Sequence, residues 1–523
     1  MTDRINVLLI GGGGREHALA MKLRESSRLG ELWTSNPENP GLAALGKAVD
    51  VPVTIREIYR LRQFIEKNAI GLVVIGPEDP LAEGFADQLS SPNTLVFGPG
   101  AEGARIESDK AWTKDLLRGA SVPIAEGKSF TDPLAAFSWL CSRVRNDKEL
   151  HRILGAPREF DTEDLKRSYI LSRIPDALAK MPPSSTGIFA AQQRALTVLN
   201  LAVAASETYP SLSDRRKYFD RLTNTDATIA AASKAPIPGL PVIKASGLAK
   251  GKGVVVPSTL AEAITAIDEI MVRKVHGEAG NVLVIEDRLE GKELSVLCIT
   301  DGNTILTLPT CRDHKRLGDR DTGPNTGGMG VICPGEDLDE KTMQRIERDI
   351  LIPTVDALKR EGINYKGVLY AGLMLTPSGP KVLEYNCRFG DPECQPLMTR
   401  LKSDLLELIL ATCRGELDQA DVQWHDGHAC SVVLASPGYP DSPKKGLEIS
   451  GIEAAAAIPN VTIHHAGTRR NPDGTIVTGG GRVLNVTAVG LDLESARKSA
   501  YEACSKIHFE GKQLRTDIGA TNG

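Results

Sequence analysis

Along its first hundred residues the chain alternates short apolar runs with segments whose apolar positions recur at helical spacing. Four runs predict strands and two longer segments predict helices: INVLLIG (5–11), 15–28, ELWTS (31–35), 55–68, GLVVIG (71–76) and TLVFGP (94–99). Strands that alternate with helices build parallel sheets covered on both faces. The pattern therefore predicts an N-terminal parallel α/β domain over residues 1–105.

A polar, helix-prone stretch interrupts this pattern over residues 144–237. It shows no strand pattern and no chemical motif, and prolines break it at several points. Residues 189–205 (FAAQQRALTVLNLAVAA) carry an apolar helical face, and such a face needs a partner to pack against. We predict a helical insertion whose apolar face packs within itself, against the parent domain, or against another subunit.

The strand pattern resumes at residue 241 and continues to the end of the chain. Strands are predicted at PVIKASG (241–247), GVVVPS (253–258), NVLVIED (281–287), ELSVLCIT (293–300), TILTLPT (304–310), KGVLYAGLMLT (366–376) and KVLEYN (381–386), and a helix over 339–361. Residues 428–519 mix short strands with a helix at 492–507. These signals predict a central domain over 106–427, with a small lobe over 238–310, and a C-terminal α+β domain over 428–523.

Composition narrows the function. A formal net charge of −5 and an aromatic content of 4% argue against nucleic-acid binding. The chain lacks an apolar run of the roughly 20 residues that span a bilayer, so we expect no membrane partner. Nine cysteines without a C-x-x-C pair fit a reducing compartment. We therefore expect a cytoplasmic multidomain protein.

The first glycine-rich loop is LLIGGGGREHALA (8–20), between a predicted strand and a predicted helix. Free backbone N–H groups at a helix N-terminus attract phosphate. The dinucleotide fingerprint fails here, because Glu16 and His17 stand where its last glycine would be, and no acidic residue ends the second strand. A site for a smaller phosphate fits better, and a plain strand–helix turn stays an alternative.

Two further loops combine glycine with cations. VIKASGLAKGKGVVV (242–256) is not a Walker A loop, because three residues rather than four separate Gly247 from Gly251. It reads either as a hairpin that folds over a polyphosphate or as a solvated lysine loop. CRDHKRLGDRDTGPNTGGMGV (311–331) is long for a loop inside a domain, and long loops are often functional.

The stretch KVLEYNCRFGDPECQP (381–396) places charge beside a predicted strand. Residues two apart in a strand share a face, so Glu384 and Asn386 project together, opposite Leu383 and Tyr385. A carboxylate and an amide oxygen suit Mg²⁺, which takes few protein ligands and shares the rest with phosphate and water. A solvent-facing polar pair is the commoner origin of such a pattern. The two cationic loops favour a phosphoryl-transfer site.

In this order, VIKASGLAKGKGV, VLVIEDRLEGKELSV and VLEYNCRFGDPE resemble the ATP-grasp fold. Together with GGGGREHA, GPEDPLAEG, DHKRLGDRDTGPNTGGMG and NCRFGDPECQP, they resemble the phosphoribosylamine–glycine ligases of purine biosynthesis. The resemblance covers about 1–140 and 238–519, and the stretch at 145–236 lacks a counterpart in the family pattern. It implies ATP-dependent joining of glycine to 5-phosphoribosylamine through a glycyl phosphate, with Mg²⁺ or Mn²⁺, in a monomer or homodimer.

The resemblance also implies roles for the residues in these motifs. Glu384 and Asn386 would hold the metal. ATP would be bound by Lys110, Lys244, Lys250, Gly251, Lys252, Gly253, Glu286, Arg288, Leu289 and Glu293. Arg388, Asp391, Asp313 and Lys315 would act on glycine and the transferring phosphoryl group. The substrates would contact Gly12, Gly13, Gly14, Arg15, Glu16, Glu78, Asp79, Thr326, Gly327, Gly328 and Met329.

The sequence departs from the family pattern at two places. The adenine hinge, EEFL in relatives, is EDRL here (286–289), and its backbone can still read adenine. Many ATP-grasp enzymes take a metal carboxylate from the strand before the Glu-x-Asn strand, and GVLYAGLMLT (367–376) offers none. Two alternatives remain: another ATP-grasp ligase of purine synthesis, and a non-catalytic nucleotide-binding regulator on the same fold.

Overall fold

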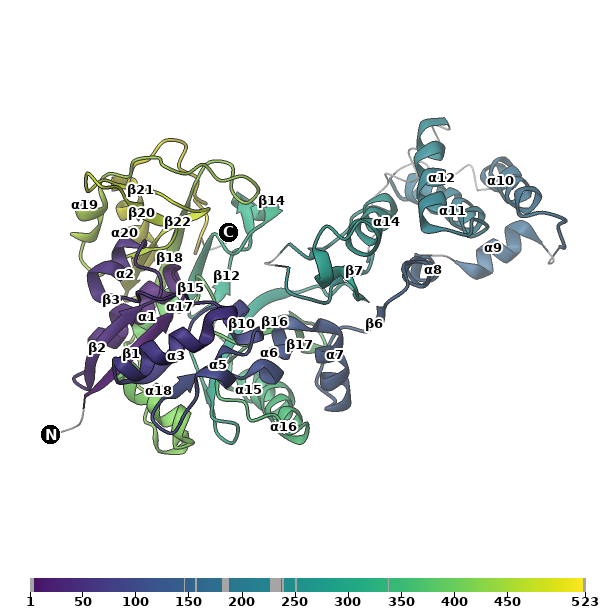
Figure 1. Cartoon of the computed structure of the whole chain (residues 1–523). Helices are drawn as coiled ribbons and strands as arrows, with labels where there is room; N and C mark the ends of the chain where they lie inside the picture. Colours follow the sequence, from purple (N-terminus) through teal and green to yellow (C-terminus); the bar gives the residue numbers. More distant parts are fainter. Residues whose placement is uncertain are drawn as a thin grey trace. The chain divides into compact units, whose positions relative to one another are not determined.

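The structure is a computed structural model of the whole chain. It describes residues 4–144, 146–155, 158–180, 188–225, 237, 239–249, 252–336 and 338–520. The chain divides into two compact units: unit 1 comprises residues 1–108, 112–124 and 290–523, and unit 2 comprises 109–111 and 125–289 (Figure 1).

The N-terminal part of unit 1 is the predicted parallel sheet, with strand order β3-β2-β1-β4-β5. Its strands are β1 (Ile5–Ile10), β2 (Leu29–Thr34), β3 (Lys47–Ala48), β4 (Ile70–Ile75) and β5 (Leu95–Phe97). Its helices are α1 (Gly14–Arg24), α2 (Pro40–Leu45), α3 (Ile58–Lys67), α4 (Glu78–Ala82), α5 (Phe85–Leu89) and α6 (Ala101–Ser108). The predicted α/β fold class is confirmed.

Strand β1 shows why the sheet is buried on both faces. Val7 and Leu9 belong to one apolar core, which includes residues of α1, whereas Leu8 and Ile10 belong to another, which includes residues of α3. Successive strand residues point to opposite faces, so a strand covered on both sides reads as an unbroken apolar run. The INVLLI sequence therefore specifies a central strand, and its carboxyl end carries the first glycine loop.

Two more sheets complete unit 1. One has the antiparallel order β11-β10-β16-β17, with β10 (Lys292–Thr300), β11 (Ile305–Thr307), β16 (Gly367–Thr376) and β17 (Gly379–Asn386). Three helices of this region are α7 (Lys110–Gly119, whose first residues belong to unit 2), α15 (Glu340–Ile346) and α16 (Ile352–Arg360). β10, within the predicted small lobe over 238–310, thus pairs with β16 of the main body. The predicted domain limits stay predictions.

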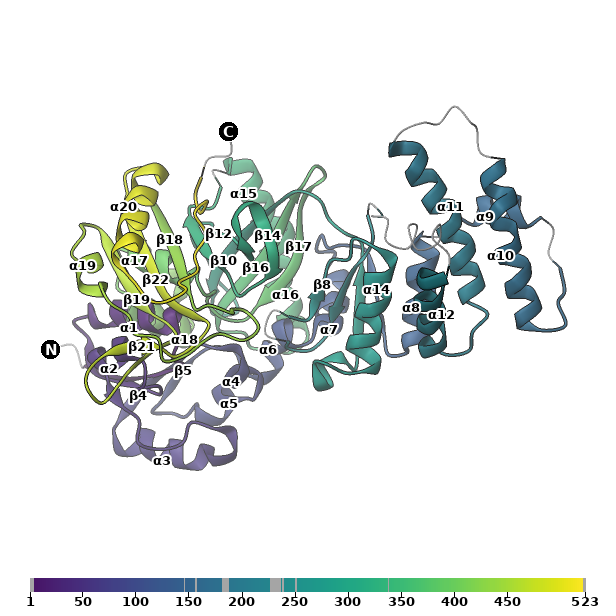
Figure 2. The same cartoon turned by 90° about the horizontal axis from the view of Figure 1, so that it is seen from above.

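The other sheet has the order β12-β15-β18-β22-β19 and includes the C-terminal region. Its strands are β12 (Arg312–Asp313), β15 (Gly330–Cys333), β18 (His428–Ala435), β19 (Val461–His465) and β22 (Arg482–Gly490). The hairpins β13 (Arg316–Gly318)–β14 (Thr322–Asn325) and β20 (Thr468–Arg470)–β21 (Ile476–Thr478) project from it. Helices α17 (Cys394–Arg400), α18 (Leu405–Arg414), α19 (Ile452–Ala456) and α20 (Leu493–Lys506) lie in the same part of the chain (Figure 2).

Among its described residues, unit 2 contains a four-stranded antiparallel sheet and six complete α-helices. The strand order is β6 (Gly127–Phe130), β9 (Leu283–Glu286), β7 (Val242–Ala245), β8 (Val254–Val255). The helices are α8 (Pro133–Val144), α9 (Asp147–Leu154), α10 (Glu163–Ala179), α11 (Ile188–Ser206), α12 (Leu212–Thr225) and α14 (Leu260–Ile267). As predicted, the described part of 144–237 is helical.

The apolar face of the insertion packs inside unit 2. Leu199 and Leu201 of α11 share one core with Ile174 of α10 and with Phe137 and Leu140 of α8. Side chains of α14 and of strands β7 and β9 complete the same core. The described side chains of this face thus pack against two of the partners considered from the sequence, the insertion itself and the parent domain.

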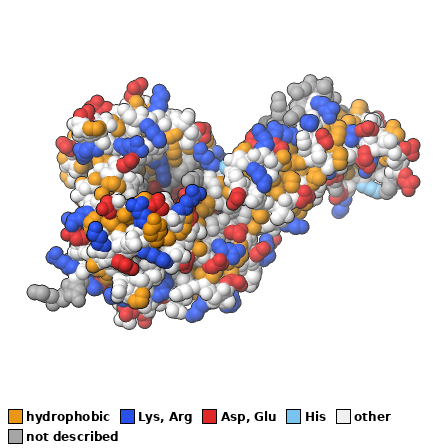
Figure 3. All heavy atoms as spheres, in the orientation of Figure 1, with side chains coloured by type: hydrophobic (Ala, Val, Ile, Leu, Met, Phe, Trp, Pro, Cys, Tyr) orange, Lys and Arg blue, Asp and Glu red, His pale blue; other side chains and the backbone are white. Residues whose placement is uncertain are grey.

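Figure 3 shows Lys and Arg side chains interspersed with Asp and Glu over the visible face. Among the described residues we find no helix with the length and apolarity needed to cross a membrane.

Candidate active site

The glycine loop between β1 and α1 has no room for side chains. Gly11 has a φ of +119°, and a Cβ there would lie 2.6 Å from Cγ of Glu16. A Cβ on Gly12 would lie 1.9 Å from Nδ2 of Asn36. Glu16 accepts a hydrogen bond from the Gly13 N–H at 2.6 Å and one from Nε of Arg15 at 2.6 Å. Close neighbours and the hydrogen bond to Glu16 therefore fix the conformation of the loop.

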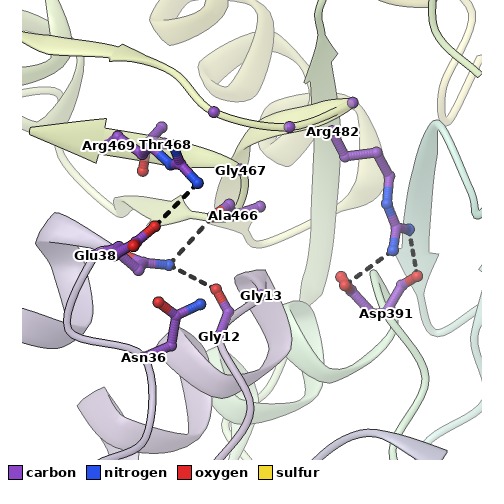
Figure 4. Close-up of a pocket in the computed structure, with 14 residues that line it drawn as sticks. Gly12, Gly13, Asn36, Glu38, Asp391, Ala466, Gly467, Thr468, Arg469 and Arg482 are labelled. Carbon is purple, nitrogen blue, oxygen red and sulfur yellow. Dashed lines mark hydrogen bonds and ion pairs between the residues drawn. The ribbon is translucent and has the colours of Figure 1, made fainter. Parts of the chain in front are cut away.

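A cavity of about 320 Å³ lies in front of this loop (Figure 4). Five connections line it, two from the N-terminal sheet, the turn after β17, and two from the C-terminal region: Gly12, Gly13, Asn36, Glu38, Asn39, Asp391, Ala466, Gly467, Thr468, Arg469, Gly479, Gly480, Gly481 and Arg482. Glu38 pairs with Arg469 at 3.0 Å on one side of it. The lining combines backbone amides and amide side chains with two arginines that are each paired with a carboxylate, and this mixture suits a polar ligand.

Asn39 ties the two walls of the cavity together. Its Oδ1 accepts from the N–H groups of Gly41 and Leu42 at the start of α2, at 2.9 and 3.3 Å. Its Nδ2 donates to the Gly12 carbonyl at 3.0 Å and to the Ala466 carbonyl at 3.2 Å. One buried amide therefore caps a helix and fixes the glycine loop against the C-terminal wall.

The C-terminal wall is the part of the site that the sequence analysis missed. Residues 466–469 lie where β19 turns into β20, and 479–482 where β21 turns into β22. The run TGGGR after the short strand β21 is the available signal, since three glycines and an arginine at a strand end resemble the loop at 11–15. Of the predicted substrate-binding residues, Gly12 and Gly13 line the cavity, and Gly14, Arg15 and Glu16 begin α1 behind it.

Arg482 connects this cavity to the turn after β17. Its Nη2 lies 2.9 Å from Oδ2 of Asp391, and its Nη1 donates to the Asp391 carbonyl (Figure 4). The same Nη1 donates to the Gly327 carbonyl. Burial alone would raise the pKa of Asp391, but the charges of Arg482 and Arg15 outweigh it and lower the pKa. Asp391 is therefore an anion held between two arginines.

Gly327 and Gly328 fix the end of the long loop against the same turn. The Gly327 N–H donates to the Tyr439 hydroxyl at 3.0 Å. Gly328 has a φ of +109°, and a Cβ there would lie 2.6 Å from Oδ1 of Asp313 and 2.6 Å from Cδ of Pro392. Met329 is fully buried. The predicted residues of this segment thus shape the backbone around Asp313.

Arg388 pairs with two carboxylates, those of Glu78 and Glu107. Its Nε lies 3.1 Å from Glu78 and its Nη2 lies 2.9 Å from Glu107. Glu107 also accepts from the Cys387 N–H at 2.8 Å. Burial raises the pKa of Glu107, whereas Arg388 and Arg15 outweigh burial at Glu78 and lower its pKa to about 2. Arg388 therefore balances two carboxylates, and Asp79 follows Glu78 in the first turn of α4.

The predicted metal residues lie on β17. Glu384 pairs with Gly372 and Asn386 with Tyr370 on the neighbouring strand. A β-bulge at Leu383 breaks the alternation predicted for it: Val382 and Tyr385 enter the core, and Leu383 stays half-buried. Beyond the bulge Glu384 and Asn386 keep the two-residue spacing of one face.

Lys315 lies beside the metal candidate. Its Nζ is 3.2 Å from Oε1 of Glu384, and this carboxylate is the main reason that the pKa of Lys315 is raised. Asp313 has a raised pKa because of burial and the nearby Glu393, and its Oδ1 is a buried oxygen without a hydrogen-bond partner. Glu393 accepts from the Tyr370 hydroxyl at 2.6 Å. An oxygen-rich group with one cation suits a divalent metal and phosphate.

Among the described residues, no three His, Cys, Asp or Glu side chains come close enough to form a metal cage. Mg²⁺ fits this donor set, because it keeps waters and shares its coordination with substrate phosphates. Glu384 and Asn386 are the groups that would meet such an ion.

Unit 2 holds most of the predicted ATP-binding residues. Lys244 on β7 is buried and pairs with Glu286 on β9 at 2.5 Å. The Lys110 Nζ donates to the Gly247 carbonyl at 3.2 Å, and the Lys252 N–H donates to the Ala249 carbonyl at 2.9 Å. Gly253, Arg288 and Leu289 are in this unit, Glu293 is in unit 1, and Lys250 and Gly251 lie outside the described residues.

Comparison with known proteins decides the family. The chain matches the N domain of phosphoribosylglycinamide synthetase at residues 5–107, its ATP-grasp (A) domain at 214–394 and its C domain at 429–521. It is 40% identical over 518 residues to phosphoribosylamine–glycine ligase from Rhodopirellula baltica, covering 99% of this chain and 97% of that one. The chain belongs to the phosphoribosylglycinamide synthetase family.

Two further relatives agree with this membership. Phosphoribosylamine–glycine ligase from Caldanaerobacter subterraneus is 36% identical over 516 residues, covering 99% of this chain and 100% of that one. The crystal structure of phosphoribosylamine–glycine ligase from Thermotoga maritima superposes with a TM-score of 0.67 at 28% identity, covering 98% of this chain and 100% of that one. The predicted family and the predicted ATP-grasp fold are confirmed.

Proposed function

We propose that the protein joins glycine to 5-phosphoribosylamine, using ATP, to give glycinamide ribonucleotide, ADP and phosphate in purine biosynthesis. The observation that carries this proposal within unit 1 is the chain of contacts from the cavity to the acidic strand. Arg482 lines the cavity, holds Asp391 and the Gly327 carbonyl, and thereby touches the loop that carries Asp313 and Lys315. Full-length identity of 40% to a ligase of that name supports the same reaction.

The reaction needs two substitutions. A glycine carboxylate oxygen attacks the γ-phosphorus of ATP, the bond to the β–γ bridging oxygen breaks, and ADP leaves. The amine nitrogen of phosphoribosylamine then attacks the carbonyl carbon of glycyl phosphate. The bond between this carbon and the bridging phosphate oxygen breaks, phosphate leaves, and the nitrogen loses a proton. Neither step needs a covalent bond to the protein, so its task is positioning and charge stabilisation.

The residues of unit 1 divide this task. The cavity, with its glycine loops and amide side chains, suits the phosphate and hydroxyl groups of phosphoribosylamine. Glu384 and Asn386 would hold Mg²⁺ or Mn²⁺, which would neutralise charge on the transferring phosphate when bound. Lys315 would place a cation beside that phosphate. Asp313, buried and with a raised pKa, would meet the ammonium or carboxylate end of glycine.

The role of Arg388 changes in this proposal. The notion that it contacts glycine comes from the resemblance alone, and its guanidinium is engaged by Glu78 and Glu107. We infer that the ion pair of Arg388 and Glu78 has a structural role, holding the turn after β17 against α4. In unit 2, Lys110, Lys244 and the hinge residues Glu286, Arg288 and Leu289 would bind ATP. The resemblance assigns the ribose to Glu293, a residue of unit 1.

We further propose that the protein is cytoplasmic and works as a monomer or homodimer on small molecules. All nine cysteines are free thiols, which supports a reducing compartment.

The test is ADP release by the purified chain with ATP, Mg²⁺, glycine and freshly generated phosphoribosylamine, each omitted in turn. The proposal predicts release only with glycine present, and a product with the mass of glycinamide ribonucleotide only when all are present. Release that follows bicarbonate or formate instead would assign a different ATP-grasp ligase. Nucleotide binding without turnover under any of these conditions would assign a regulator.

A further inference from the structure

The tip of the β13–β14 hairpin has a backbone that needs support. Arg320 and Asp321 are consecutive non-glycine residues with φ of 56° and 54°. The left-handed region is unfavourable for such residues, and it persists only where neighbouring structure fixes it, often at functional sites. The hairpin lies within the loop that carries Asp313, Lys315 and the glycine turn at 326–329.

The C-terminal segment supplies this support, and it runs beside β14 in Figure 1. Nη1 of Arg515 donates to Oδ1 of Asp321 at 2.7 Å. Oδ2 of Asp517 accepts from the Arg320 N–H at 2.7 Å. The Thr516 N–H donates to Oδ1 of Asp319 at 2.7 Å. Both left-handed residues are therefore held directly by side chains of residues 515–517.

The segment is itself anchored on α20. The Tyr501 hydroxyl donates to the Arg515 carbonyl at 2.8 Å and accepts from the Ile518 N–H at 3.0 Å. Arg497 donates to the carbonyls of Thr516 and Ile518 at 2.7 and 3.1 Å. The C-terminal segment is thus a rigid bracket between the C-terminal domain and the hairpin.

The Arg515 guanidinium is buried and paired with one carboxylate, and it also contacts the hairpin. Its side chain is 1% exposed, and Asp517 pairs with it through both oxygens at 2.7 Å each. That bidentate pair already balances the charge. The additional contacts reach Asp321, whose side chain is 71% exposed, and the Arg316 carbonyl at 3.3 Å. A buried arginine that reaches out to an exposed turn fixes that turn.

The contact with the Arg316 carbonyl lies one residue from Lys315, a residue of the proposed active site. Arg316 follows Lys315, whose Nζ lies 3.2 Å from Glu384. On the other side of the hairpin, Thr326 donates to the Lys315 carbonyl at 2.8 Å. The backbone of Lys315 is therefore held from both sides, by the glycine turn and, one residue further, by Arg515.

We propose that Arg515 is a positioning residue for phosphoryl transfer, which holds the 313–330 loop, and with it Lys315, in its working geometry. The inference rests on the proposed function for its kinetic part. Its structural part, that the C-terminal bracket orders the hairpin, stands apart from it.

The test compares three full-length variants with the wild type. Arg515→Met removes the guanidinium and keeps an unbranched buried side chain. Asp321→Asn removes the exposed partner and keeps a residue that tolerates the left-handed region. Arg28→Met is the matched control, because Arg28 pairs with Glu407 at 2.9 Å in the same unit and does not contact the loop. Hydrogen exchange of the 316–325 amides and the kcat and KM for each substrate are measured.

For Arg515→Met we expect faster exchange confined to 316–325 and a kcat lowered about ten- to a hundredfold, since small misplacements of a catalytic group have effects of that size. The KM for ATP should stay within about twofold, because the loss falls on the reacting geometry. Asp321→Asn should shift both readouts in the same direction by less, and Arg28→Met should shift neither.

Normal exchange at 316–325 together with an unchanged kcat in Arg515→Met would overturn the proposal. If that variant fails to fold, Asp321→Asn decides alone, and wild-type exchange and kcat there would overturn it equally. A wild-type protein that releases no glycine-dependent ADP would refute the proposed function, and the exchange experiment would still test the bracket.

Discussion

Replacing Arg388 by Met should destabilise unit 1 strongly, although the sequence suggests a catalytic arginine. Arg388 lies 3.1 Å from Glu78 and 2.9 Å from Glu107. The side chain of Glu107 is buried, with 8% exposed, and that of Arg388 is largely buried, with 16% exposed. Removing one partner from a buried ion pair typically costs about 3–5 kcal/mol, because it leaves uncompensated charge.

The pKa of Glu78 gives a second magnitude for the same cluster of charges. It is lowered from 4.5 to about 2 in the folded protein, chiefly because Arg388 and Arg15 outweigh the effect of burial. At about 1.4 kcal/mol per pKa unit, that difference corresponds to about 3 kcal/mol of folding stability at neutral pH. The lowered pKa means that this stability is fully present above pH 4.5 and is lost as the pH falls toward 2.

The assay is urea unfolding followed by tryptophan fluorescence in a Trp139→Phe background, which removes the only tryptophan of unit 2. At pH 7 we expect Arg388→Met to lower the free energy of unfolding by about 3 kcal/mol or more. As the pH falls from 4.5 toward 2, the variant should lose less further stability than the wild type, because Glu78 no longer has its main cation.

Arg348→Met is the matched control. Arg348 pairs with Asp349 at 2.7 Å, but its side chain is 74% exposed, so its loss should change stability by less than about 1 kcal/mol. An Arg388→Met protein as stable as the wild type, yet inactive, would refute the structural role and restore Arg388 to direct catalysis.

Four other outcomes are expected. Glu384→Gln should lower kcat by about a hundredfold or more with unfolding unchanged, and a near-normal rate at low Mg²⁺ would remove it from the metal site. Gly328→Ala should lower both stability and kcat, whereas Gly362→Ala, with a positive φ but open space around its Cβ, should lower only stability. Burial lowers the pKa of His17 from 6.5 to about 2. As the pH drops below 6.5, this group should therefore lower the free energy of unfolding of the wild type by about 1.4 kcal/mol per pH unit. In urea unfolding, His17→Gln should make this dependence on pH less steep. Replacing 146–236 with a Gly-Ser linker should retain glycine-dependent ADP release but lower the stability of unit 2, and a soluble, folded deletion without activity would contradict this.

Local patterns predicted the elements of this protein well. The INVLLIG and KVLEYN runs became β1 and β17, and Glu384 and Asn386 share a face because strand periodicity is a property of the backbone. The bulge at Leu383 was not predictable in this way, since it depends on the pairing with β16. Periodicity therefore places side chains only as far as the ladder stays regular.

Long-range partners limited the prediction of the site. Arg388 and Glu107 are 281 positions apart, and nothing local to either residue indicates the other. The cavity likewise joins Gly12 to Gly480 through a fold that brings two distant glycine turns together. The motif identified Arg388, but only the fold shows that its guanidinium pairs with Glu78 and Glu107.

The transfer of ¹⁸O from glycine tests the central claim most directly. The protein is incubated with ATP, Mg²⁺, phosphoribosylamine and glycine labelled with ¹⁸O in its carboxylate, and the released phosphate is analysed by mass spectrometry. Because the carboxylate oxygen attacks phosphorus and leaves with it, the account predicts one ¹⁸O atom in each phosphate released during ligation. Unlabelled phosphate, released at the same rate as glycinamide ribonucleotide forms, would contradict carboxylate phosphorylation and with it the proposed chemistry.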